Sequence, residues 1–149
     1  MRKIITTLAA CALCLSTAPL AAQQSVVMLQ VLDGFTGVAI ARHPVSISLG
    51  ATPAEAKARK NAQNTYTNER GILMLPLPQG AAGWIQVWTG DMHGCEPHPE
   101  AASYSLAKIA ATGVQAPNIC SHMSVRISPG HFVVYMRELT AAERAALHH

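Results

Sequence analysis

Short segments in which apolar and polar residues alternate recur along this 149-residue chain. The clearest is 45–49, where Val45, Ile47 and Leu49 alternate with two serines, as in a strand with one buried face. Turn sequences rich in Gly, Asn and Pro follow several of these segments. Further strands are predicted at 26–32, 65–67, 72–77, 84–89, 125–127 and 131–139. The spacing predicts an all-β sandwich of about seven short strands.

Two capping boxes and one glycine stop predict short helices between and after the strands. Thr52-Pro53-Ala54-Glu55 and Thr140-Ala141-Ala142-Glu143 each place glutamate three residues after a threonine N-cap. The first predicts a short surface helix or an ordered insertion within 50–64, and the second predicts a helical tail over 140–149. From 92 to 123 the strand pattern stops, and 105–112 followed by Gly113 predicts a helical insertion.

The first 22 residues have the pattern of a secretory signal peptide. Arg2 and Lys3 precede an apolar run over 4–15, and small residues follow it up to Ala22, where we place the cleavage. The run is too short to cross a membrane, which takes about 20 residues. An alternative is a lipoprotein signal, because Leu8-Ala9-Ala10-Cys11 resembles a lipobox and would make Cys11 a lipidated first residue.

Cleavage after Ala22 leaves a nearly neutral domain over 23–139 with its tail. Two of the 11 Lys and Arg residues lie in the signal segment, so nine cations face eight anions in the remainder. This balance predicts neither nucleic-acid binding nor attraction to an anionic membrane. We interpret three neighbouring cations as a solvated helix face: Lys57, Arg59 and Lys60. The expected location is the periplasm or the exterior, with no membrane insertion after cleavage.

Two turn motifs and the strands around them point to a family. Asp33-Gly34-Phe35-Thr36-Gly37 follows the first strand, and Thr65-Tyr66-Thr67-Asn68-Glu69-Arg70-Gly71 leads into a strand that ends in Leu-Pro. This order resembles the carboxypeptidase regulatory-like domain, over about 26–90 and 125–139. The resemblance implies a prealbumin-like (transthyretin-like) Greek-key β-sandwich.

The resemblance also bears on activity. Despite its name, the carboxypeptidase regulatory-like domain is an accessory domain and carries no catalytic zinc. The related hydroxyisourate hydrolases end in Tyr-Arg-Gly-Ser, whereas this chain ends in Leu147-His148-His149. The segment 104–120 is similar to a part of small secreted proteins with no assigned function. We therefore expect no enzymatic activity and no cofactor.

Cys95 and Cys120 are the two cysteines outside the signal segment. A single pair of cysteines in an exported chain predicts a disulfide. The bond would close the insertion at 95–120 and contribute about 3–4 kcal/mol by restricting the unfolded chain.

A metal site is the alternative function for the residues around these cysteines. His93 and His98 flank the first cysteine, and His122 and Met123 follow the second, so a disulfide would bring the four side chains near one another. Imidazole and thioether ligands favour copper, with zinc as a second choice. The sequence His93-Gly94-Cys95-Glu96 also spells H-x-x-E, which we interpret as a chance match to a zinc-peptidase motif.

Two tryptophans on one strand are the other candidate site. Trp84, Gln86 and Trp88 share one face of the predicted strand, and Ile85 and Val87 share the other. If the aliphatic face is core, the tryptophans present a platform for a sugar ring or a protein partner; if it is not, they are core residues. The sequence thus predicts a non-enzymatic binding or structural module that binds a glycan or a protein partner. The alternative is a module that binds copper or zinc.

Overall fold

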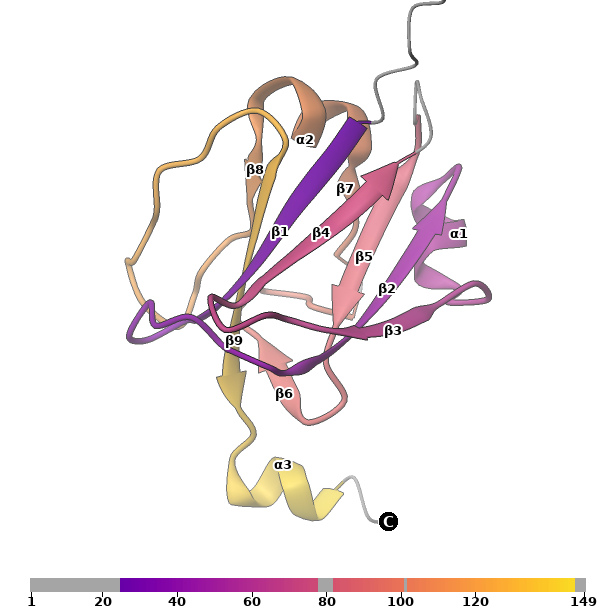
Figure 1. The fold of residues 1–149 in the computed structure, drawn as a ribbon. Helices are drawn as coiled ribbons and strands as arrows, with labels where there is room; N and C mark the ends of the chain where they lie inside the picture. Colours follow the sequence, from indigo (N-terminus) through magenta and orange to yellow (C-terminus); the bar gives the residue numbers. More distant parts are fainter. Residues whose placement is uncertain (1–24, 78–81, 101, 147–149) are drawn as a thin grey trace, which may run out of the picture.

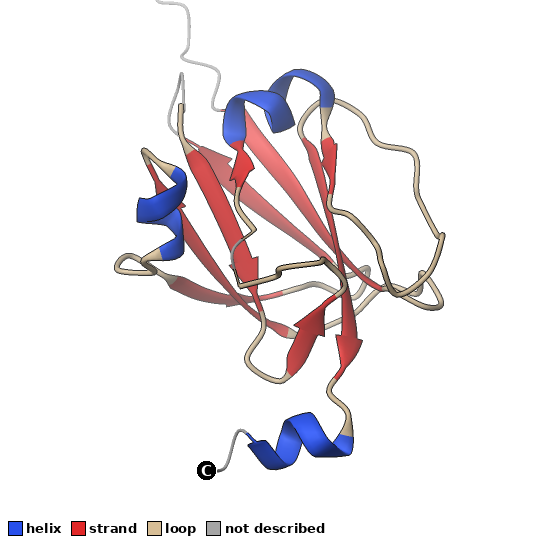
Figure 2. Ribbon diagram, turned by 180° about the vertical axis from the view of Figure 1, so that it is seen from behind, coloured by secondary structure: helices blue, strands red, loops and turns tan. Residues whose placement is uncertain are grey.

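The computed structural model describes residues 25–77, 82–100 and 102–146. The predicted signal peptide (1–22, with Cys11) and the last three tail residues (147–149) lie outside the described residues. Within these ranges, strands form two sheets that pack face to face, and three short helices lie around them (Figure 1; Figure 2). The described ranges contain no helix that is long and apolar enough to cross a membrane.

The first sheet, sheet A, contains β1 (Ser25–Asp33), β4 (Ile72–Leu77), β6 (Met92–Gly94), β8 (Val114–Gln115) and β9 (His131–Glu138). Its order is β4-β1-β9-β6, and β8 pairs with β9. The central strands β1 and β9 are parallel, whereas β4 runs antiparallel to β1. Because β1 occupies one edge of β9 along its length, β6 and β8 share the other edge at its two ends.

The second sheet, sheet B, contains β2 (Pro44–Gly50), β3 (Gln63–Tyr66), β5 (Trp84–Trp88) and β7 (Tyr104–Ser105). Its order is β3-β2-β5-β7, with antiparallel pairing throughout. Five of the predicted strands are therefore present with ends that differ by at most one residue, and the predicted strand at 65–67 is displaced to 63–66.

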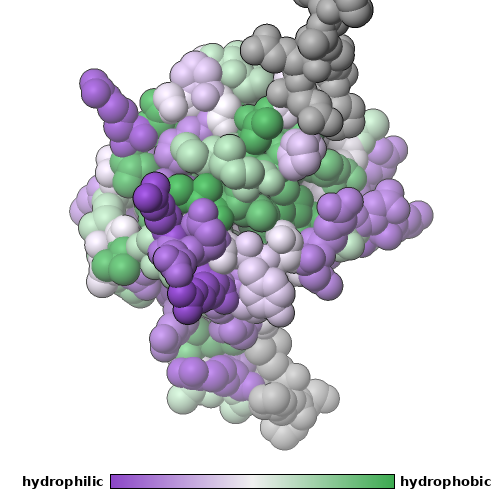
Figure 3. All heavy atoms as spheres, in the orientation of Figure 1, coloured by the Kyte–Doolittle hydropathy of each residue, from purple (hydrophilic) through white to green (hydrophobic). Residues whose placement is uncertain are grey.

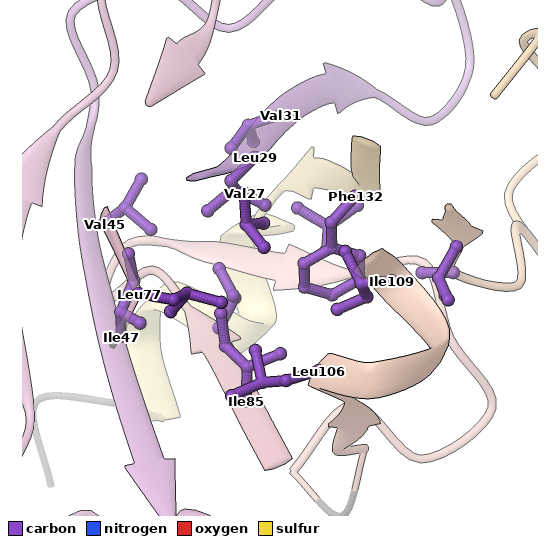
Figure 4. Packing of buried hydrophobic residues seen from close by; sticks show 14 of the residues in the cluster. Val27, Leu29, Val31, Val45, Ile47, Leu77, Ile85, Leu106, Ile109 and Phe132 are labelled. Carbon is purple, nitrogen blue, oxygen red and sulfur yellow. The ribbon is translucent and has the colours of Figure 1, made fainter. Parts of the chain in front are cut away.

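The core lies between the two sheets and takes one face of each strand (Figure 4). Sheet A contributes alternate residues of β1 and β9, and sheet B contributes alternate residues of β2 and β5. Leu106 and Ile109 of α2 (Leu106–Thr112) complete it at one end, beside Phe132. The principal strand residues are Val27, Leu29, Val31, Val45, Ile47, Ile85, Val87, Phe132, Val134 and Met136.

The predicted helix starts are confirmed by their hydrogen bonds. In α1 (Pro53–Lys57), the Thr52 hydroxyl accepts a bond of 3.2 Å from the Glu55 amide. In α3 (Ala141–Ala146), the Thr140 hydroxyl accepts one of 3.2 Å from the Glu143 amide, and the Glu143 carboxylate accepts one of 2.7 Å from the Thr140 amide. These bonds satisfy amides that a helix start leaves without an intrahelical partner.

The Asp33 turn is closed by its own side chain. Asp33 Oδ1 accepts hydrogen bonds from the Phe35 amide at 3.1 Å and from the Thr36 amide and hydroxyl, both at 2.8 Å. Burial raises the pKa of Asp33, but the bonds from Thr36 and Phe35 outweigh it and leave the pKa below its usual value. Gly37 has a φ of 69°, which glycine adopts without strain.

Thr67, Asn68 and Gly71 hold the second motif in a similar way. The buried Thr67 hydroxyl donates to the Ile40 carbonyl at 2.7 Å and accepts from the His43 amide at 3.0 Å. Asn68 Oδ1 accepts from the amides of residues 70 and 72. Gly71 has a φ of 68°, and a Cβ there would lie 2.7 Å from a carbonyl oxygen of β1. The motif residues therefore tie the entry to β2 against the turn before β4.

The predicted strand at 125–127 is wrong. Both edges of β9 are occupied, because Cys95 and Ala116 amides donate to Tyr135 and Val133 carbonyls, each at 2.8 Å, between β6 and β8. The segment instead runs across the outer face of sheet A, where Val125 and Ile127 pack against Val133 and Tyr135. The prediction that the strand pattern stops over 92–123 is also wrong, because β6 and β8 pair with β9 and β7 pairs with β5.

Candidate functional site

The aliphatic face of β5 is core, so its tryptophans lie on the outer face of sheet B. Ile85 is fully buried in the sandwich, whereas Trp84 and Trp88 are each partly exposed. Gln86 between them is fully buried, and its Nε2 donates to the Glu100 carbonyl at 3.0 Å. The chain around Glu100 therefore lies over Gln86. The exposed parts of the two tryptophans are therefore separated by the covered Gln86 and do not form one continuous platform.

Arg59 covers one of these tryptophans. Its guanidinium carbon lies 4.0 Å from the centre of the Trp88 ring, a cation–π contact. Arg59 follows α1 with a φ of 56°, a conformation that is unfavourable for a residue with a side chain. α1 itself packs on β2 and β5, and its Ala56 is fully buried. Arg59, Lys57 and Lys60 are all exposed, as expected of a solvated face, and Arg59 in addition lies over the Trp88 ring.

A pocket of about 370 Å³ opens beside this pair, where the chain passes from β5 to β6. Its lining includes Arg59, Trp88, Thr89, His93, Glu96 and Glu100. Aromatic, cationic and acidic groups thus converge on one hollow, together with apolar side chains of β5 and β9. The volume lies in the range of sites for small organic ligands.

Glu96 is the buried acid of this pocket. It is 7% exposed, and the Tyr104 hydroxyl donates a hydrogen bond to its carboxylate. Burial raises the pKa of Glu96, and the bond from Tyr104 only partly opposes this. Burial and the neighbouring carboxylate also raise the pKa of Tyr104, so the phenol keeps its proton and remains the donor.

Two buried polar atoms near the pocket lack a partner among the described residues. Thr89 lines the pocket, is 7% exposed and has an unpaired Oγ1. Gln86 Oε1 is also unpaired, although its residue is fully buried. Ser48 Oγ and the Tyr135 hydroxyl are buried without a partner in the same way, so of these atoms only Thr89 Oγ1 belongs to a residue that lines the pocket.

A second hollow of about 610 Å³ adjoins the first and shares Gly90, Met92 and Leu139 with it. His43 Nε2 lies 2.9 Å from Asp91 Oδ1 in its wall, and Arg144 of α3 also lines it. The two hollows together extend from the Trp88 ring to the C-terminal helix, so a ligand longer than one ring has space to continue.

The Cys95–Cys120 disulfide is confirmed and closes the insertion as predicted. Its Cα atoms are 5.4 Å apart, and Cys95 is 1% exposed against Val133 and Tyr135. The Asn118 side-chain amide and the Ser121 hydroxyl donate to the Gly34 carbonyl at 2.9 and 2.6 Å. The disulfide therefore fastens the covering segment to the outer face of sheet A and to the Asp33 turn.

The four candidate metal ligands do not converge, although the disulfide forms. Within the described residues, no three His, Cys, Asp or Glu side chains are placed to hold a metal ion. His93 lines the first pocket, His98 is exposed beside Glu100, His122 is exposed, and Met123 lies against Gly37. The expected approach of these residues is thus corrected, because bridged cysteines do not constrain where neighbouring side chains point.

Sequence reasoning did not identify Glu96, Thr89 and Arg59 as members of one site. In the sequence Glu96 stands out only through the chance H-x-x-E match, and no pattern marks Thr89. The preceding Cys95 is the one signal for Glu96, because a disulfide-bonded cysteine is usually buried and its neighbour in the chain then lies close to the interior. No local pattern indicates that Arg59 lies over Trp88.

Comparison with family models, curated proteins and solved structures found no match for this chain. The resemblance to the carboxypeptidase regulatory-like domain therefore stays a prediction.

Proposed function

We propose that this protein is a non-enzymatic binding module whose ligand is a glycan, held in the pocket beside Arg59 and Trp88. The observation that carries the proposal is the partly exposed Trp88 ring at a pocket of about 370 Å³ that also contains two carboxylates. A pocket of this size suits a small ligand, whereas a stable protein interface covers about 800 Å² on each partner. A glycan is therefore favoured over a protein partner.

The chemistry of the lining supports a sugar. The C–H faces of a sugar ring pack on the apolar surface of an aromatic side chain, and Trp88 lines the pocket although Arg59 occupies one face of its ring. Sugar hydroxyls donate to carboxylates and accept from guanidinium groups, roles available to Glu96, Glu100 and Arg59. The unpaired hydroxyl of Thr89 adds a group that can donate or accept.

The test is titration with a panel of neutral and acidic oligosaccharides, followed by calorimetry and by tryptophan fluorescence. We expect saturable binding that Trp88→Ala abolishes. Trp84→Ala is the matched control, because Trp84 lies on the same strand face but does not line the pocket. The proposal is overturned if no glycan of the panel binds, or if Trp88→Ala and Trp84→Ala weaken binding equally.

We further propose that the chain is exported to the periplasm or the exterior, with residues 1–22 removed as a signal peptide. The Cys95–Cys120 disulfide supports an oxidising compartment. Intact mass spectrometry of the protein recovered from an expressing bacterium should give the mass of residues 23–149, less two hydrogens. An uncleaved mass contradicts the proposal, and a lipid-modified Cys11 identifies the alternative.

The finer fold assignment is also a proposal. The two sheets and the hydrogen-bonded turns at Asp33 and Asn68 support a prealbumin-like Greek key of the carboxypeptidase regulatory-like kind. A crystal structure whose strand connections differ from those of that family would overturn it.

A further inference from the structure

Among the described residues, the outer face of sheet A is covered over one half only. The segment that ends at β9 packs on Val133 and Tyr135, as described above. The other half, formed by β1 and β4, carries outward side chains that are mostly apolar and partly exposed, including Val26 (43%) and Met74 (55%). Figure 3 shows hydrophobic residues gathered at the centre of this face.

Three of the outward residues form a row across adjacent strands. Met28 of β1 is in register with Met74 of β4 on one side and with His131 of β9 on the other. Val27 and Leu29, the chain neighbours of Met28, point into the core, so Met28 points outward. In-register partners project from the same face of a sheet, so Met74, Met28 and His131 form a row on one face with Met28 in the middle.

The backbone bonding brings the two methionines close. The Met28 amide donates to the Gly130 carbonyl at 2.8 Å, on the β9 side. Met28 therefore turns its backbone groups away from β4, and Met28 and Met74 are a non-hydrogen-bonded pair. The Cα atoms of such pairs are about 4.5 Å apart, and their side chains approach more closely than those of hydrogen-bonded pairs.

His131 is held in place at the other end of the row. It is 8% exposed, and its Nε2 lies 3.1 Å from Oε1 of Gln30, which is the next outward residue of β1. When Nε2 carries the ring proton and donates it to Gln30, Nδ1 keeps a lone pair for a ligand. A second partner that fixes the tautomer in this way is typical of histidines that bind metals.

We propose that His131, Met28 and Met74 bind a soft monovalent metal ion, and that this ion is Cu(I). Thioether sulfur selects Cu(I) over the harder divalent ions, and imidazole is an accepted copper ligand. The row spans two strand spacings, about 9–10 Å, which two flexible methionine side chains and one fixed ring can bridge. Met74, which is 55% exposed, provides the entry path from solvent.

This site is independent of the glycan pocket. It shares no residue with the pocket lining, and it uses none of His93, His98, His122 or Met123. Its ligand set contains a single histidine, so it differs from the divalent sites built from three or more His, Cys, Asp or Glu side chains.

The test is an anaerobic titration of the oxidised protein against Cu(I) bound to the coloured chelator bicinchoninate. We expect the protein to withdraw one equivalent of Cu(I) from the chelator, and X-ray absorption of the loaded protein to show sulfur and nitrogen neighbours. Ag(I), which does not change oxidation state, should bind with the same stoichiometry in native mass spectrometry.

Variants assign the ligands. Met74→Leu and Met28→Leu should each weaken Cu(I) binding at least tenfold, because loss of a supporting group alone costs about 10–100-fold. Met74 is exposed, so Met74→Leu should keep the wild-type thermal midpoint. Met123→Leu and His122→Ala are the matched controls and should bind as the wild type does. The proposal is overturned if the wild type leaves Cu(I) with the chelator, or if both leucine variants bind normally.

Discussion

Tyr104 donates a hydrogen bond to the Glu96 carboxylate and thereby joins the two sheets at the pocket. Tyr104 lies on β7 at the edge of sheet B, whereas Glu96 follows β6 of sheet A. The Tyr104 ring also packs against Phe132 of β9, with centroids 4.9 Å apart. Glu96, the acid of the proposed glycan site, thus takes part in the packing between the sheets. A change in its charge should therefore change the stability of the fold.

Glu96→Gln should change how stability depends on pH. Burial raises the pKa of Glu96 above its ordinary value of 4.5, so the folded state holds this proton more tightly than the unfolded chain. Stability is therefore lost as the pH rises from 4.5 through the raised pKa. The variant cannot ionise, so its thermal midpoint should exceed that of the wild type at neutral pH and converge with it in acid.

Thermal unfolding followed between about pH 4 and 8 measures this difference. Glu100→Gln is the matched control, since the Glu100 side chain is 72% exposed and loss of its charge should change stability little. A constant offset between Glu96→Gln and the wild type across the range contradicts the prediction.

Removal of the disulfide by Cys95→Ala with Cys120→Ala should lower the free energy of unfolding by about 3–4 kcal/mol. The bond closes a 25-residue separation, and its loss gives the unfolded chain more conformational freedom. Urea unfolding of the variant, compared with the oxidised and reduced wild type, measures the effect. The reduced wild type should match the variant, and an unchanged urea midpoint would refute the expected role.

Thr67→Val should lower the free energy of unfolding by about 1–3 kcal/mol, because valine keeps the shape but leaves the Ile40 carbonyl and the His43 amide without their partner. Thr65→Val, two residues earlier on β3, is the control and should cost less than about 0.5 kcal/mol. Chemical unfolding of both variants decides between them, and equal losses would show that the hydroxyl of Thr67 has no special role.

Glu143→Gln should loosen α3 without affecting the sandwich. Two hydrogen bonds from Arg137, of 2.7 and 2.8 Å, lower the pKa of Glu143 far below its ordinary value of 4.5. The contact is thus fully formed above 4.5 and is lost as the pH falls through the lowered pKa. Faster amide exchange at 142–146 in the variant at neutral pH is the expected result, with Glu138→Gln as control. Unchanged exchange would show that α3 is held by other contacts.

The sequence was sufficient for features that depend on neighbouring residues or on a single pairing choice. Alternation of Val45, Ile47 and Leu49 predicts a strand because side chains of a strand point to opposite faces every second residue. Capping boxes predict helix starts because their bonds join residues three apart. Cys95 and Cys120 could pair in only one way outside the signal segment. These rules describe the sandwich, its helices and its disulfide.

The sequence could not predict which strand edges were already occupied. Val125 and Ile127 alternate with polar residues as a strand would, but both edges of β9 had partners, so the segment covered a sheet face instead. The short strands β6, β7 and β8 have no strong pattern of their own, because their pairing depends on the longer strands beside them. Alternation within a segment does not show whether a strand edge is free to pair with it.

The candidate sites were decided by tertiary structure alone. Arg59 reaches Trp88 because α1 packs on the outer face of sheet B, and Glu96 meets Tyr104 where the chain passes from β6 of sheet A to β7 of sheet B. Met28 meets Met74 and His131 through the register of three strands that are far apart in the chain. The sequence by itself determined which segments alternate and which cysteines join, because these follow from nearest neighbours. Only the folded chain decided which distant side chains share a surface, because sheet order and register are set by burial of the whole core.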